Sequence, residues 1–156
     1  MTNPFRTVHH ICVVVHDIDK TVNNYISMGF GPWRDYPPLT EYTTLAVPNE
    51  AAFFQTKYKV ADLDNVQLQL CQPSPLDCPQ RRFLDARGEG VFHLSFEADI
   101  DAAGSAEETR GLEVLMRGRR DDGSGFTYFD TQAKAGVVLA IRKSPTVWAG
   151  CSATSP

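Results

Sequence analysis

Alternation of apolar and polar positions is clearest near the N-terminus. Residues 7–16 are rich in β-branched side chains, and this composition with period-two alternation predicts a strand. One face holds His10, Cys12 and Val14, and the other holds Ile11, Val13 and Val15. The second face is purely apolar, so we expect it to carry a helix. Asp17 is placed to cap that helix over residues 18–28, and Gly29 to end it.

The same pattern returns half a chain later. Residues 90–101 again place a histidine, His93, near the start of a strand that runs into Asp-Ile-Asp, as His10 does before residues 17–19. A segment that recurs in this way predicts a duplicated module. His10 and His93 then hold equivalent positions in the two copies.

The rest of the chain completes each copy. In residues 65–72 Gln67, Gln69 and Cys71 alternate with Val66, Leu68 and Leu70, and in residues 136–142 Val138, Ala140 and Arg142 alternate with Val137, Leu139 and Ile141. Further elements are expected as follows: a short strand in 31–38, a loop to 50, a strand at 53–61, a linker at 73–90 with a helical turn at 80–86, a strand at 91–98, a helix at 100–111, a strand at 113–117, a loop at 118–125 and a strand at 126–131. The order is βαβββ, twice.

Composition narrows the class of function. The 156 residues, 42% apolar and 22% charged, suit one compact domain, and a net charge of −4 without a basic run argues against nucleic acid or an anionic membrane as partner. No segment approaches the roughly 18 apolar residues of a membrane helix, and the first residues do not form a secretion signal, so we expect a cytosolic protein. The irregularly spaced Cys12, Cys71, Cys78 and Cys151 indicate reduced thiols. Small-molecule chemistry is the better expectation.

Four segments carry a resemblance to a known family. They are His-His-Ile-Cys-Val-Val-Val (9–15), Gln-Leu-Gln-Leu-Cys-Gln-Pro (67–73), Val-Phe-His-Leu-Ser-Phe (91–96), and Phe-Thr-Tyr-Phe-Asp-Thr (126–131) followed by Gly-Val-Val-Leu-Ala-Ile (136–141). In this order and spacing they resemble the vicinal-oxygen-chelate superfamily of glyoxalases, bleomycin-resistance proteins and extradiol dioxygenases, most closely its methylmalonyl-CoA-epimerase-like branch. The resemblance covers the chain to about residue 145.

The resemblance implies an α+β fold in which two tandem βαβββ modules form an open cup of curved sheet with helices outside. We expect one domain over residues 1–145, with module one at 7–72, a linker at 73–90, module two at 91–142, antiparallel strands, and a loose tail at 146–156. Alternation sends Ile11, Val13, Val15, Leu68, Leu70, Leu139 and Ile141 to the helix side. A homodimer is also expected, because members of the superfamily commonly pair modules across chains.

The resemblance also implies a metal site inside the cup. Three of its four ligand positions carry over to His10, Gln69 and His93, but the fourth, usually Glu, is Ala140. Two imidazoles and an amide leave both charges of a divalent ion uncompensated. The metal then either binds weakly, with a further ligand from substrate or a nearby carboxylate, or is not used.

Two residues are candidates for catalysis. Arg142 shares a face with Ala140 and could bind a substrate oxyanion at the cup rim, although an exposed strand-end arginine is the simpler interpretation. Tyr58 stands near where the epimerase branch can place its acid or base, and Lys57 or Lys59 takes that place if the register shifts. Further candidates that the sequence does not rank are Glu41, Glu50 and Asp130.

Two functions of different kinds remain. The first is an isomerase, an epimerase or racemase, that removes a proton next to a carbonyl and passes through an enolate. The second is a non-catalytic protein that sequesters small molecules such as drugs, which the missing Glu favours. A lyase of the same superfamily is close to the first, and a dioxygenase is disfavoured by the missing Glu. Aromatic residues expected near the cup favour an apolar or aromatic ligand: Trp33, Tyr36, Phe53, Phe54, Tyr128 and Phe129.

Overall fold

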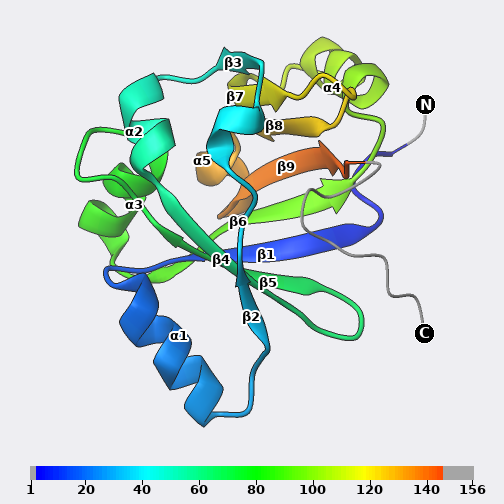
Figure 1. Ribbon diagram of the computed structural model, residues 1–156. Coiled ribbons are helices and arrows are strands. Elements are labelled where there is room, and N and C mark those ends of the chain that lie inside the picture. The colour runs from blue at the N-terminus through cyan, green and yellow to red at the C-terminus, as the bar shows by residue number, and fades with distance from the viewer. Residues whose placement is uncertain (1–2, 146–156) are drawn as a thin grey trace.

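The computed structural model describes residues 3–145 as an α+β fold built on one curved sheet (Figure 1). The strands are β1 (Val8–Val14), β2 (Trp33–Asp35), β3 (Thr44–Ala46), β4 (Lys57–Asp62), β5 (Gln67–Gln72), β6 (Gly90–Glu97), β7 (Val114–Arg119), β8 (Gly125–Phe129) and β9 (Val138–Lys143). The helices are α1 (Ile18–Ser27), η1 (Leu39–Glu41), α2 (Glu50–Gln55), α3 (Pro79–Arg87), α4 (Ile100–Thr109) and α5 (Gln132–Ala135). In the described part of the chain the sheet order is β2-β4-β5-β1-β6-β9-β8-β7-β3. The expected tail at 146–156 lies outside the described residues.

The duplication is visible in the topology. β1, α1, β2, β4 and β5 make one unit, β6, α4, β7, β8 and β9 make the other, and β1 pairs with β6 in antiparallel fashion at the junction. The expectation of antiparallel strands throughout is wrong, because β1 pairs with β5, and β6 with β9, in parallel. The helix after the first strand returns the chain to its starting end. The next strand therefore runs in the first strand's direction, and two further reversals leave the last strand in that same direction.

Helix α1 begins and ends where its capping residues predict. The Asp17 carboxylate accepts a hydrogen bond from the Lys20 backbone N–H at 3.0 Å, which satisfies one of the unpaired donors of the first turn. Gly29 follows the helix with φ of +96°, a conformation that side chains with a Cβ atom rarely adopt. Figure 1 shows α1 and α4 at opposite ends of the sheet, as the pseudo-symmetry requires.

The segment from residue 37 to 55 departs most from the expectation. The predicted loop contains η1 and β3, and the predicted strand at 53–61 begins as helix α2. Asn49 starts this helix by accepting a hydrogen bond from the Ala52 N–H at 3.2 Å. Strand β3 crosses from module one to pair with β7 at the far edge of module two. The short helix α5 was also not expected.

Both faces of the sheet are packed. On the convex side Val15 and Leu70 pack with α1, and Ile141 packs in a cluster with α4, as alternation predicts. The concave side also has an apolar cluster, formed by Cys12, Val14, Cys71, Phe92, Val138 and Ala140 together with Tyr42 and Phe53 from the 37–55 segment. That segment therefore covers part of the concave face. Cys12, Cys71 and Cys78 are buried free thiols, as expected, and Cys151 lies outside the described residues.

Candidate active site

Strand register places the candidate residues in two adjacent rows across the concave face. Cys12 on β1 lies beside Gln69 on β5 and His93 on β6. His10 lies beside Ser95, which in turn lies beside Ala140 on β9. His10 and His93 are thus diagonal neighbours, within reach of each other's rings.

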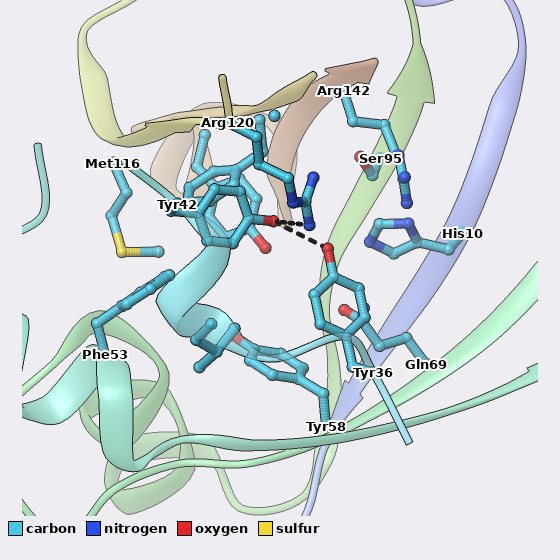
Figure 2. Close-up of a pocket in the computed structure, with 14 residues that line it drawn as sticks. His10, Tyr36, Tyr42, Phe53, Tyr58, Gln69, Ser95, Met116, Arg120 and Arg142 are labelled. Carbon is cyan, nitrogen blue, oxygen red and sulfur yellow. Dashed lines mark hydrogen bonds between the residues drawn. The ribbon is translucent and has the colours of Figure 1, made fainter. Parts of the chain in front are cut away.

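The two module histidines meet. The Nε2 atoms of His10 and His93 are 2.8 Å apart, and both side chains are buried, with exposed fractions of 5% and 0%. Gln69 lines the same cavity as His10, and Figure 2 shows its side chain below the imidazole. Ala140 is fully buried in the row of His10.

Hydrogen bonds assign the protons on this cluster. Arg142 Nη1 donates to His9 Nδ1 at 3.1 Å, so that nitrogen is unprotonated. His10 Nδ1 lies 2.8 Å from the same atom and must be the donor. Nε2 of His10 is then the acceptor for the Nε2–H of His93, and the unprotonated Nδ1 of His93 has no partner. The sequence did not single out His9.

All three imidazoles are held neutral. Burial, followed by the positive charge of Arg142, lowers the pKa of His93 to about 3 and that of His9 to about 4. Burial, His93 and Arg142 lower the pKa of His10 well below its usual value. The floor of the cavity is therefore uncharged imidazole close to a guanidinium.

Arg142 is not an exposed strand-end residue. Its side chain is 4% exposed, lines the cavity and extends toward His10 (Figure 2). Beyond His9, its partners are Ser144 Oγ at 3.4 Å and the Glu97 carboxylate at 3.7 Å from Nε. A permanent cation thus occupies the face that holds Ala140.

Arg120 is a second buried arginine, and the sequence pattern did not identify it as a site residue. Arg120 Nη2 donates to the Tyr42 hydroxyl at 2.9 Å, and its guanidinium lies 4.2 Å from the centre of the Tyr42 ring. The Tyr42 hydroxyl lies 3.0 Å from that of Tyr36, and both contacts are drawn in Figure 2. Arg120 lies in the segment 118–125, which was predicted as a loop, so nothing in the sequence indicated that it would lie inside the cavity. Ser95 was not identified either, but it follows His93 by two residues, so strand alternation places it on the same face as His93.

Aromatic side chains form most of the remaining wall. The cavity is lined by His10, Tyr36, Leu39, Tyr42, Phe53, Tyr58, Gln69, Ser95, Met116, Arg120, Gly125, Phe126, Tyr128 and Arg142, and has a volume of about 30 Å³, about the share of one liquid water molecule. Of the aromatic residues expected near the cup, Tyr36, Phe53 and Tyr128 line it. Trp33 packs against the α1 cluster instead, and Phe129 against the α4 cluster.

Tyr58 lines the cavity, whereas its two lysine neighbours lie on the other side of β4. Lys59 Nζ pairs with Asp35 at 2.6 Å, and Lys57 is exposed. Burial, followed by the nearby Cys71, raises the pKa of Tyr58 well above its usual value, so its hydroxyl stays protonated at neutral pH. Tyr58 can therefore donate a proton but is a poor base.

The three acidic candidates lie outside the cavity lining. Glu41 pairs with Arg120 Nε at 3.6 Å, while Glu50 is exposed at the start of α2 and Asp130 is exposed after β8.

The donor set does not fit a divalent metal. Two ligands at 90° with bonds of about 2.1 Å lie about 3.0 Å apart, so the spacing of the two Nε2 atoms by itself suits an ion. The charge of the site does not suit a divalent ion. The third donor is the neutral amide of Gln69, and Arg142 lies on the side where a carboxylate ligand would be needed. A ligating imidazole also usually donates its other N–H, and His93 Nδ1 has no partner. Among residues 3–145, no three His, Cys, Asp or Glu side chains come together for an ion.

In the described part of the chain, four buried polar atoms on the cavity lining have no hydrogen-bond partner. They are Gln69 Oε1, Ser95 Oγ, Arg120 Nε and Arg142 Nε. An unpaired buried polar group costs about 1–3 kcal/mol, so such atoms concentrate where water or a ligand supplies the partner. The arrangement can hold a small polar group at its inner end and apolar atoms toward its aromatic wall.

Family comparison agrees with this fold. Residues 9–129 match the model of the Glyoxalase/Bleomycin resistance protein/Dioxygenase superfamily, and the chain belongs to this family. No curated protein sequence matches the chain.

Solved structures of epimerases share the fold. A variant of the Streptomyces coelicolor methylmalonyl-CoA epimerase in complex with 2-nitronate-propionyl-CoA is 26% identical, with a TM-score of 0.66 over 88% of this chain and 96% of that chain. A methylmalonyl-CoA epimerase in complex with methylmalonyl-CoA and NH4+ is 25% identical, with a TM-score of 0.67 over 92% and 97%. The Mycobacterium tuberculosis methylmalonyl-CoA epimerase, 18% identical over 93% of each chain with a TM-score of 0.67, supports the fold alone.

Proposed function

We propose that the protein is an isomerase that removes a proton next to a carbonyl of a small apolar or aromatic substrate and returns it through an enolate. The observation that carries this proposal is that the buried Arg142 guanidinium extends toward the neutral imidazole of His10 in one cavity. Enolate chemistry needs an electrophile for the developing oxyanion and a base for the proton. The 26% identity to an epimerase structure supports the same class of reaction.

Each residue of the cavity has a role in the proposed reaction. The substrate displaces the N–H of His93 from Nε2 of His10, the substrate C–H bond breaks, and its proton goes to that nitrogen. The electron pair of the bond moves toward the carbonyl oxygen, where Arg142 and the amide of Gln69 hold the negative charge. Tyr58, protonated at neutral pH, lies on the wall of the same cavity and can donate a proton to the carbon. The proton held by His10 then passes to the tyrosinate, which returns both residues to their starting states. Reprotonation from a different side inverts the centre. Arg142 thus takes the electrophilic role that a divalent metal has in relatives with a fourth, acidic ligand.

Solvent deuterium exchange tests this proposal. The purified protein in D2O with a chelator should exchange the proton next to the carbonyl of at least one compound in a panel of aryl ketones, 2-oxo acids and methylmalonyl-CoA, as followed by proton NMR. Arg142→Gln should slow the exchange at least 100-fold, because a buried electrophile is lost. Arg81→Gln, which changes a surface arginine paired with Asp85, is the matched control and should leave the rate unchanged.

A non-catalytic binding protein is the second candidate. It is favoured because no Asp or Glu within residues 3–145 lines the cavity, since carboxylates are common bases in this chemistry. Binding of panel compounds without exchange above the rate in buffer would establish this candidate and refute the isomerase.

A further inference from the structure

The inner cavity presents positive charge. Among the described residues its lining includes Arg120 and Arg142 and no Asp or Glu, in a protein whose formal net charge is −4. The nearest carboxylates, Glu41 and Glu97, lie 3.6 and 3.7 Å from the Nε atoms of the two arginines, beyond hydrogen-bond distance. Their side chains are 35% and 38% exposed, against 6% and 4% for the arginines. Buried cations with solvent-screened partners favour an anion beside them.

Unpaired polar atoms mark where the anion would bind. Ser95 Oγ and Arg142 Nε are buried without a hydrogen-bond partner, and both groups can donate to an oxyanion. The Gln69 amide is also unpaired at its oxygen, and a rotation of the amide group presents its NH2 instead. A carboxylate, with two oxygens and about four acceptor positions, matches this set, and its bonds to a guanidinium are among the stronger hydrogen bonds.

Shape separates the anionic group from the rest of the ligand. The inner cavity, at about 30 Å³, has room for little more than such a head group. It shares Tyr36, Leu39 and Tyr58 with an outer hollow of about 260 Å³, whose other lining residues are Pro37, Pro38, Thr40, Phe54 and Thr56. For comparison, an apolar cavity of about 150 Å³ accepts benzene. The outer hollow is therefore large enough for an aromatic ring.

We propose that this site binds a small aromatic carboxylate without a metal, with the carboxylate against Arg142 and Ser95 and the ring in the outer hollow. The inference deepens the proposed function and rests on it in one respect, namely that the enolised carbonyl lies next to this carboxylate. The shared chemistry, a carboxylate on an organic body, also occurs in carboxyacyl thioesters such as methylmalonyl-CoA. The apolar outer hollow favours the free aromatic acid.

Calorimetric titration with phenylacetate and its neutral analogue phenylacetamide, both in EDTA, tests the proposal. Phenylacetate should bind at least tenfold more tightly than the amide. Arg142→Gln should abolish this preference, Arg142→Lys should retain part of it, and Arg81→Gln should leave it intact. Circular dichroism confirms that each variant is folded, and Ser95→Ala provides a milder change that should weaken phenylacetate binding alone.

Several outcomes would overturn the proposal. Equal affinity for acid and amide, binding that requires a divalent metal, or tighter binding of methylmalonyl-CoA than of phenylacetate would each do so. The proposed function fails separately. Phenylacetate binding with no proton exchange in any panel compound would refute the isomerase but leave the carboxylate site standing. Exchange confined to neutral ketones would refute the carboxylate site but leave the isomerase standing.

Discussion

Ala140 and Arg142 lie two residues apart on β9, and together they set the charge of the site. The small side chain at 140 removes a negative ligand, and the guanidinium at 142 adds a positive charge that also lowers the pKa values of His10 and His93. A protonated imidazole and a divalent cation are both disfavoured there for the same electrostatic reason. Neutral imidazole and an anionic ligand are the compatible partners.

Restoring the acidic ligand tests this explanation. Ala140→Glu should raise affinity for Co²⁺ at least tenfold, because a carboxylate beside His10 and His93 offsets part of the ion's charge. Cobalt absorption titration measures it, with Ala140→Gln as the neutral control of the same shape. Equal affinity in the two variants would show that charge is not what limits metal binding.

At the scale of elements, β8 brings Tyr128, Phe126 and Gly125 to the cavity wall. Gly125 has φ of +155°, and a Cβ atom there would lie 2.0 Å from the carbonyl oxygen of Gly118 on β7. The close approach of β7 and β8 therefore depends on glycine at this position.

Substitution should expose this dependence. Gly125→Ala should lower the free energy of unfolding by at least about 2 kcal/mol, through the clash with the Gly118 carbonyl and an unfavourable backbone conformation. Gly104→Ala in α4 is the contrast, since its added methyl group meets no atom within 4 Å and should raise stability by about 0.5–1 kcal/mol. Urea denaturation measures both. Loss of stability in Gly104→Ala, or none in Gly125→Ala, would contradict the prediction.

At the scale of the whole molecule, the modules join where β1 pairs with β6, and the buried histidines cross that junction. In the unfolded chain each histidine takes up a proton near pH 6.5, but in the folded protein His9 and His93 do so only near pH 4 and 3.

No helix within residues 3–145 is long and apolar enough to cross a membrane. The homodimer expected from the family stays a prediction.

Acid should therefore destabilise the fold before the carboxylates titrate. Between pH 6.5 and about 4 the unfolded state binds more protons, so the free energy of unfolding should fall as pH falls, by up to about 1.4 kcal/mol per pH unit for each neutral histidine. Urea denaturation between pH 6.5 and 5 measures the slope. His9→Asn should reduce it, and a flat profile in the unaltered protein would contradict buried neutral imidazoles.

Local pattern was sufficient for most of the fold. Alternation and capping predicted β1, α1 and the repeat at β6, because period-two burial and cap chemistry depend only on neighbours in sequence. The faces of Gln69 and Arg142 followed from the same alternation. The convergence of His10 and His93 was expected from the duplication, and the structure places their Nε2 atoms 2.8 Å apart.

Tertiary structure alone decided the rest. The 37–55 segment packs on the concave face, and its strand β3 pairs with the far edge of the other module, contacts that its own sequence does not encode locally. Arg120 enters the cavity from a loop, where no periodicity specifies direction. The buried Arg142 contacts His9 from β1 and Glu97 from β6, which lie far from it in the sequence. By itself the sequence determined which residues of the alternating strands face the cup, and only long-range packing decided that Arg120 and Arg142 are buried there.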